Sequence, residues 1–120
     1  MKKNDSNVTI GELRSDVKRF INEREWERFH NPKDLAEAIC IEAAELLEQF
    51  QWRTSYESSS WKNMPSKTKR IGEELADVVI YCLSMANTMK IDLTDAILKK
   101  PKINEAKYPV EKFLGKAHAL

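Results

Sequence analysis

The sequence predicts an all-α protein, and three observations indicate this fold class. Only 3 glycines and 4 prolines occur in 120 residues, so little turn chemistry is available for a β-sheet. Alanine, glutamate, leucine and lysine are plentiful, and these residues favour helices. Apolar side chains recur at helical spacing, as at Leu13, Val17 and Ile21. We therefore expect a bundle of four to five helices.

Capping signals start the first two helices. Thr9, with Glu12 three residues later, forms a capping-box pattern for a helix that should run to about Phe29. Asn31, followed by proline, should cap a second helix that extends to about Trp52. The middle of this helix, LAEAICIEAAELLEQF, is apolar nearly all round, so we expect it to be central and mostly buried.

The serine-rich stretch RTSYESSSW is predicted to be a loop between the second helix and a third one. The third helix should begin at Pro65 or Ser66 and end near Lys90. Asp92 or Thr94 can cap a fourth helix that reaches about Lys107. Pro101 lies inside this pattern, where it should kink or interrupt the helix, because proline removes a hydrogen bond and clashes with the preceding turn.

The length of the chain predicts a single domain. Residues 1–8 are polar and are expected to form a flexible N-terminal tail. The domain should cover residues 9–108. Residues 109–120 should form a C-terminal tail that is available to pack on a partner.

Charge and hydropathy exclude several classes of function. The 20 basic and 19 acidic residues nearly balance, so no field over the whole molecule points to a nucleic acid polymer or an anionic membrane. No apolar run approaches the roughly 20 residues that span a bilayer, and the N-terminus lacks the apolar stretch of a secretory signal. Cys40 and Cys82 lie in apolar helical runs and are predicted to be buried free thiols. We expect a cytoplasmic protein.

Four carboxylates lie inside otherwise apolar helical runs: Glu42 and Glu45 in EAAE, and Glu74 and Asp77 in ELAD. Residues three apart on a helix are neighbours, so each pair projects side by side. An unpaired carboxylate on a buried face costs several kcal/mol and two carboxylates repel each other, so a positive partner is required. Mg²⁺ suits the cluster because it prefers oxygen ligands and retains waters for substrate, and Mn²⁺ is an expected substitute.

Two alternatives to a magnesium site exist. Ordinary salt bridges on a solvated edge would explain either pair alone, but two such pairs on helices that otherwise look like core favour a metal. A di-iron bundle needs a histidine three residues after a glutamate on each of two helices. His30 and His118 are the only histidines, and neither has that spacing. The sequence therefore favours a hard, redox-inactive ion.

Other aromatic and basic residues have the chemistry to bind the base and the phosphates of a nucleotide. Trp26, Trp52 and Trp61 lie at helix ends or in the predicted loop, where a ring can stack on a base or plug the end of a bundle. Tyr81 is one turn beyond Asp77 on the same helical face. Four lysines either neutralise phosphates or form a solvated stripe on the fourth helix: Lys99, Lys100, Lys102 and Lys107.

Over roughly residues 10–115, the chain resembles the all-α nucleoside triphosphate pyrophosphohydrolases of the MazG type. The resemblance rests on EREWERFHNP, EAAELLEQFQW, EELADVVIYC and NEAKYP, and it is nearest to the small dCTP pyrophosphatase branch. It implies hydrolysis between the α- and β-phosphates, which gives a nucleoside monophosphate and pyrophosphate, in a house-cleaning role. It also implies homodimers or homotetramers whose sites are completed by a neighbouring subunit.

The resemblance implies roles for individual residues. The four acids would hold Mg²⁺, and one of them or the metal would activate the attacking water; it does not assign the base. The residues that would bind the (d)NTP are Trp26, His30, Trp52, Tyr81, Lys100, Asn104, Lys107 and Tyr108.

Two departures from the family pattern fall on substrate-recognition positions. Val17 stands where the animal dCTP enzymes carry a histidine in the nucleotide pocket, and Pro101 follows Lys100 in a stretch that is otherwise helical in those relatives. The reaction is therefore better supported than the preference for a particular base. The first candidate substrate is a cytosine deoxynucleotide. Two other hypotheses stay open: a nucleotide-binding module without turnover, and a purely structural helical oligomer.

Overall fold

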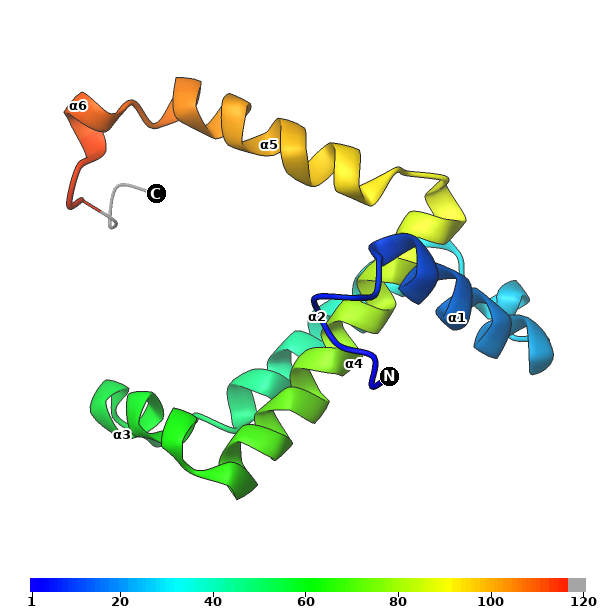
Figure 1. Cartoon of the computed structure of the whole chain (residues 1–120), viewed down its shortest axis with the longest axis horizontal. Coiled ribbons are helices and arrows are strands. Elements are labelled where there is room, and N and C mark those ends of the chain that lie inside the picture. The colour runs from blue at the N-terminus through cyan, green and yellow to red at the C-terminus, as the bar shows by residue number, and fades with distance from the viewer. Residues whose placement is uncertain (117–120) are drawn as a thin grey trace. The chain divides into compact units, whose positions relative to one another are not determined.

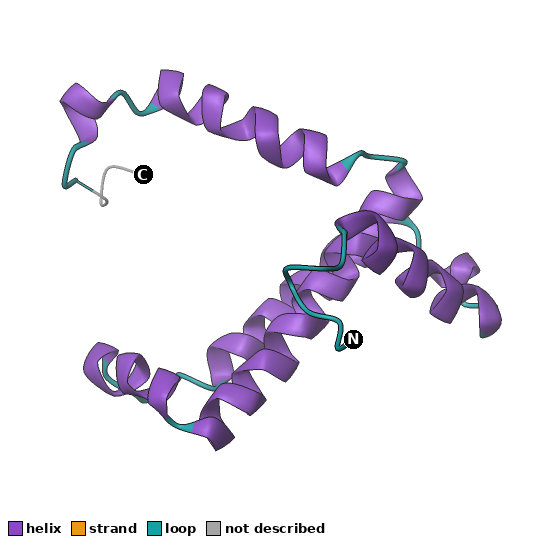
Figure 2. Cartoon of the chain, in the orientation of Figure 1, coloured by secondary structure: helices purple, strands orange, loops and turns teal. Residues whose placement is uncertain are grey.

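A computed structural model describes residues 1–116, and all regular structure in them is helical, with no strand (Figure 2). The all-α prediction is thereby confirmed. The chain forms two compact units, Met1–Lys90 and Ile91–Leu120. The predicted domain limits at residues 9 and 108 stay predictions. Within the described part of the chain, no helix is both long and apolar enough to span a membrane.

The first unit is built on two long antiparallel helices, α2 (Pro32–Glu48) and α4 (Pro65–Met89), which lie side by side (Figure 1). The helix α1 (Ile10–Glu23) packs on the C-terminal part of α4. Asn87 of α4 joins the two, because its Oδ1 accepts from Arg14 Nε at 3.0 Å and its Nδ2 donates to the Arg14 carbonyl at 3.1 Å. This pairing fixes the side of α4 that α1 covers.

The predicted helix starts are confirmed. Thr9 Oγ1 accepts the backbone N–H of Glu12 at 3.1 Å, and Asn31 Oδ1 accepts that of Asp34 at 2.9 Å. The helix α4 begins at Pro65, where a missing N–H costs nothing because the first turn has no partner for it. Each start depends on residues within one turn of it, which is why the sequence alone locates it.

The first helix ends earlier than predicted, at Glu23. Glu25 adopts a left-handed backbone with φ 53°, which turns the chain out of the helix. Trp26 thereby packs edge-on against Phe20, with ring centroids 5.9 Å apart. The remainder of the predicted helix is a short 3₁₀ segment, η1 (Glu27–Phe29).

The second helix also stops short, at Glu48 rather than near Trp52. The chain turns after this residue, and the ring of Phe50 stacks on that of Trp61 at a centroid distance of 5.1 Å. Trp52 then has φ 70°, a left-handed conformation that bulky residues rarely adopt. The end of α2 therefore coincides with a contact between two residues that are well separated in sequence, and no glycine or proline marks it.

The predicted loop over residues 53–63 is largely helical. It contains α3 (Ser55–Ser60) and the 3₁₀ segment η2 (Trp61–Asn63). Thr54 caps α3, since its Oγ1 accepts the N–H of Glu57 at 3.1 Å. The sequence carried this signal, a threonine followed by a glutamate three residues later, and the serine content obscured it.

In the second unit, α5 (Leu93–Lys107) runs unbroken through Pro101, so the predicted interruption is wrong. The residues around Pro101 are exposed, and water can satisfy the carbonyl that loses its partner. The helix ends at Lys107 as expected. A short helix, α6 (Val110–Phe113), then lies within the predicted C-terminal tail, whose residues 117–120 are outside the described part of the chain.

Few side chains of the described residues are fully buried. The buried apolar ones are Leu35, Leu83 and Ala86. On α2, Ile41 is 58% exposed and Leu47 67% exposed, so the prediction of a mostly buried second helix is wrong for a single chain. The reason is that α4 covers only one side of α2 and leaves its other apolar side to solvent.

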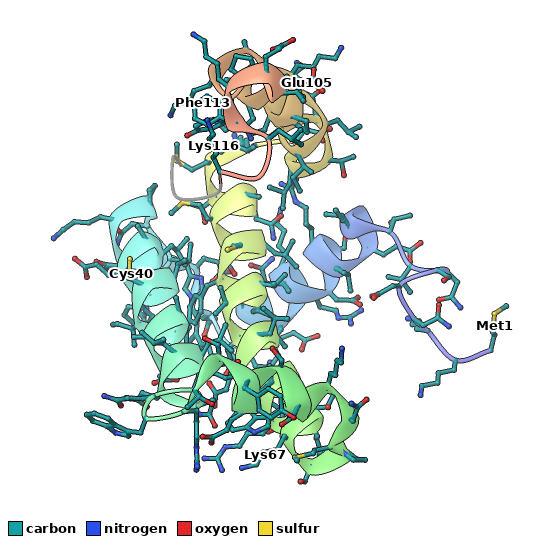
Figure 3. The ribbon with its side chains drawn as sticks, turned by 90° about the vertical axis from the view of Figure 1, so that its left-hand side faces the viewer. Met1, Cys40, Lys67, Glu105, Phe113 and Lys116 are labelled. Carbon is teal, nitrogen blue, oxygen red and sulfur yellow. The ribbon has the colours of Figure 1, made fainter. Side chains whose placement is uncertain are left out.

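Both cysteines are free thiols, as predicted, but neither is fully buried. Cys40 is exposed on α2 (Figure 3), and Cys82 is half-buried. The expectation of burial fails for the same reason as for the rest of α2, because the apolar run that contains Cys40 is covered on one side only.

Replacing Asn87 with alanine should weaken the packing of α1 on α4. Loss of two side-chain hydrogen bonds at a half-buried position should lower the free energy of unfolding by about 1–2 kcal/mol. Urea unfolding at one fixed protein concentration measures this change. The control is Asn7→Ala, whose exposed side chain makes only local hydrogen bonds, from the Asn4 N–H and to the Lys2 carbonyl and Met1, and whose effect should stay within about 0.5 kcal/mol. Equal effects of the two substitutions would contradict the role of Asn87.

Candidate active site

Carboxylates from α2 and α4 converge where the two helices pair. Glu42, Glu45 and Glu74 each offer one oxygen, and these oxygens lie within 4.8 Å of one another. The sequence explains this convergence, since both acid motifs lie on the faces that the antiparallel pairing brings together. Three of the four predicted metal ligands thus form one cluster, called the acid cluster below.

Two oxygens of the acid cluster are buried without a partner. Glu42 Oε2 and Glu74 Oε2 accept no hydrogen bond from any described residue. Burial is the largest cause that raises the pKa of the Glu42 carboxyl. A hydrogen bond with the Glu45 side chain and the negative charge of Glu45 raise this pKa further, and the charges of Asp77 and Glu74 add to the effect. The ionised cluster is therefore unfavourable by itself, and an oxygen-only donor set of this kind fits a hard divalent cation.

Asp77, the fourth predicted ligand, stands beside the cluster. Its carboxylate is near enough for its charge to raise the pKa of Glu42, although it is not one of the three convergent groups. One helical turn joins it to Glu74 on α4. The structure therefore gathers all four predicted acids in one place and leaves Asp77 at its edge.

A pocket of about 390 Å³ opens next to Asp77, and we call it the aromatic pocket. Three of the predicted substrate-binding residues lie in its wall: Trp26, His30 and Tyr81. The rings of His30 and Tyr81 are stacked, with centroids 6.4 Å apart. The early end of α1 matters here, since it places Trp26 in the wall rather than on a helix. The rest of the wall consists of Asp16, Val17, Phe20, Ile21, Asp77, Ile80 and Ser84.

A smaller pocket of about 160 Å³ adjoins the aromatic pocket, and the two share four wall residues: Val17, Ile21, His30 and Ser84. Ser84 was missed by the sequence analysis. It is only 4% exposed, and its hydroxyl has no partner among the described residues. The signal available in the sequence was its position seven residues after Asp77, on the same face of the helix.

Trp52, another predicted binding residue, lies in the turn that follows α2. It is 91% exposed and does not line the aromatic pocket of its own chain. Trp61 packs on Phe50 instead, with Lys67 Nζ 4.8 Å from its ring centroid (Figure 3 labels Lys67). Four predicted residues belong to the second unit, three of them at successive turns of α5: Lys100, Asn104, Lys107 and Tyr108.

Residues 38–118 match the sequence profile of the MazG-like family. The chain belongs to this family. The match covers the acid cluster, Tyr81 and the whole of α5, so the resemblance that the motifs predicted is confirmed.

Individual relatives agree with this assignment. The chain is 39% identical over 101 residues to dCTP pyrophosphatase 1 of Homo sapiens and 36% identical over 112 residues to dCTP pyrophosphatase 1 of Bos taurus. These alignments cover 84% and 93% of this chain but 59% and 66% of the relatives, so the chain spans less than two thirds of their length. A pyrophosphatase of Archaeoglobus fulgidus is similar in structure, with a TM-score of 0.75 and 37% identity over 90% of this chain and 99% of that one.

Glu42→Gln should stabilise the protein when no divalent ion is present. The folded-state pKa of Glu42 is raised, so the folded chain holds this proton more tightly than the unfolded chain does. Stability is therefore lost as pH rises above the usual value of 4.5, and glutamine removes that loss. In EDTA at pH 8, the melting temperature of the variant should exceed that of the wild type by a few degrees, and the difference should shrink toward pH 5.

A matched control is Glu37→Gln on the same helix, where the acid is exposed and lies 3.6 Å from Lys33. Its effect on the melting temperature should be small at both pH values. If Glu42→Gln is no more stable than this control in EDTA, folding does not disfavour the ionised form of Glu42.

Proposed function

We propose that the chain is an Mg²⁺-dependent nucleoside triphosphate pyrophosphohydrolase that cleaves a (d)NTP to a (d)NMP and pyrophosphate. The observation that carries the proposal is the adjacency of the acid cluster, with its two unpaired buried oxygens, to an aromatic pocket large enough for a nucleobase. Membership of the MazG-like family and the names of the relatives support it.

Glu42, Glu45, Glu74 and Asp77 would hold the metal. When bound, Mg²⁺ or Mn²⁺ supplies positive charge that offsets both the carboxylates and the phosphate oxygens. One of the four carboxylates accepts a proton from the attacking water, a role that requires it to lie within hydrogen-bond reach of that water.

The aromatic pocket would bind the base. Trp26 offers a ring for stacking, and the stacked pair of His30 and Tyr81 forms a second flat surface. The two relatives named dCTP pyrophosphatase 1 make dCTP, or a modified dCTP, the first candidate substrate. The role near the triphosphate that the family resemblance implies stays a prediction for four polar residues of the second unit: Lys100, Asn104, Lys107 and Tyr108.

We further propose that the chain works as a homodimer or homotetramer in the cytoplasm. Apolar side chains such as Ile41 and Leu47 are exposed on α2, and a second copy would cover them. Trp52, exposed on its own chain, would then be available to complete a neighbouring site. The exposed thiol of Cys40 suits a reducing compartment.

Removal of one negative charge from the acid cluster should abolish hydrolysis and leave the fold intact. Glu45→Gln and Asp77→Asn change shape little, and each should lower the rate of pyrophosphate release more than about 100-fold at saturating Mg²⁺. Circular dichroism and gel filtration confirm folding. The control is Glu73→Gln, which alters an exposed acid next to Glu74 and should keep wild-type turnover. Wild-type turnover in either cluster variant would overturn the metal assignment.

A panel of canonical and modified (d)NTPs with Mg²⁺ tests the reaction itself. The expected products are pyrophosphate and the monophosphate in equal amounts, with the highest kcat/KM for a cytosine deoxynucleotide. Release of inorganic phosphate and a diphosphate would show cleavage at the other phosphoanhydride. Binding without any product would instead support the non-catalytic nucleotide-binding module.

A further inference from the structure

Ser84 lies in the wall of the aromatic pocket with an unsatisfied hydroxyl. It is almost completely buried, and its Oγ has no hydrogen-bond partner among residues 1–116. A serine in a helix can bond to a carbonyl of the preceding turn, and this one does not. Because buried polar atoms are nearly always paired in proteins, an unpaired one at a pocket surface indicates a ligand atom that pairs with it.

The position of Ser84 along α4 determines which part of a nucleotide it can meet. Asp77, Tyr81 and Ser84 line the same pocket at positions i, i+4 and i+7, so they follow one another along the helix. Seven residues correspond to about 10 Å of helix. A nucleotide with its triphosphate at the acid cluster would place its base beside Tyr81, and the edge of the base opposite the glycosidic bond would then face Ser84.

Two of the residues that line both pockets with Ser84, Val17 and Ile21, are apolar and offer no hydrogen bond. The polar residues beyond them line the smaller pocket and not the aromatic pocket: Lys18, Asn22, Glu27, Asn87 and Thr88. His30, which also lines both pockets, is stacked against Tyr81. A hydroxyl both donates and accepts, so it suits an edge on which an amino group adjoins a ring nitrogen.

We propose that Ser84 is a specificity-determining residue whose hydroxyl hydrogen-bonds to the base edge opposite the glycosidic bond. The ligand class is a nucleoside triphosphate with a hydrogen-bonding group on that edge. A base without such a group is discriminated against, because it leaves the buried hydroxyl unpaired. The inference rests on the proposed nucleotide pocket and does not require that hydrolysis occurs.

Calorimetry with two non-hydrolysable probes tests the proposal. One probe is the α,β-imido triphosphate of deoxycytidine; the other is the same compound with 2-pyrimidinone as its base, which lacks the 4-amino group. With Mg²⁺, the wild type should bind the cytosine probe about tenfold more tightly, as expected for one hydrogen bond. Ser84→Ala should bind both probes with the same affinity. This affinity should be no higher than that of the wild type for the 2-pyrimidinone probe.

Two further measurements separate this role from a structural one. Without ligand, Ser84→Ala should melt a few degrees above the wild type, because the substitution removes an unpaired buried hydroxyl. The control is Ser58→Ala in α3, whose hydroxyl already donates to the Ser55 carbonyl at 2.8 Å. This variant should keep the tenfold preference and should gain no stability.

The proposal is overturned if Ser84→Ala retains the preference for the cytosine probe, if it loses affinity for both probes equally, or if the wild type binds neither. Turnover of dCTP, measured in parallel, tests the proposed function separately. A preference that disappears in Ser84→Ala, together with no pyrophosphate release from dCTP, would refute hydrolysis and leave the role of Ser84 standing.

Discussion

Mutual repulsion among carboxylates is the constraint on which the rest of the first unit depends. The pairing of α2 with α4 is the most extensive helix contact in the described part of the chain, and it brings the carboxylates of Glu42, Glu45 and Glu74 close to one another. Without a cation, the same contact that holds the helices together also opposes ionisation of Glu42. A cation bound among these carboxylates would offset their repulsion, so that helix packing and cation binding would strengthen each other.

The aromatic pocket is formed by α4, by α1 and by the segment that follows α1. Helix α4 supplies one wall, from Asp77 to Ser84, and α1 supplies another. The left-handed Glu25 then folds the chain back so that Trp26 joins them. Two of the candidate acids, Glu74 and Asp77, thus lie on the same helix as the buried hydroxyl of Ser84.

Features that depend on residues within one turn were predictable from the sequence. The caps at Thr9 and Asn31 and the pairing of acids three residues apart belong to this class. The end of α2 was not predictable, because the contact of Phe50 with Trp61 joins residues beyond one helical turn. The end of α1 was not predictable either, because a glutamate gives no sign of the left-handed backbone that Glu25 adopts. The exposure of α2 was missed for another reason: hydrophobicity indicates that a face must be covered, and does not indicate by which chain.

Trp52 combines two unfavourable properties, a left-handed backbone and a side chain almost wholly in water. Such a conformation costs of the order of 1–3 kcal/mol in a residue other than glycine. Libraries of variants sorted for thermal survival alone should therefore accumulate glycine or asparagine at this position. Libraries sorted for any property that uses the indole should keep tryptophan. The outcome of these two selections would reveal whether the strain is an accident of the turn or is maintained for what the exposed ring contacts.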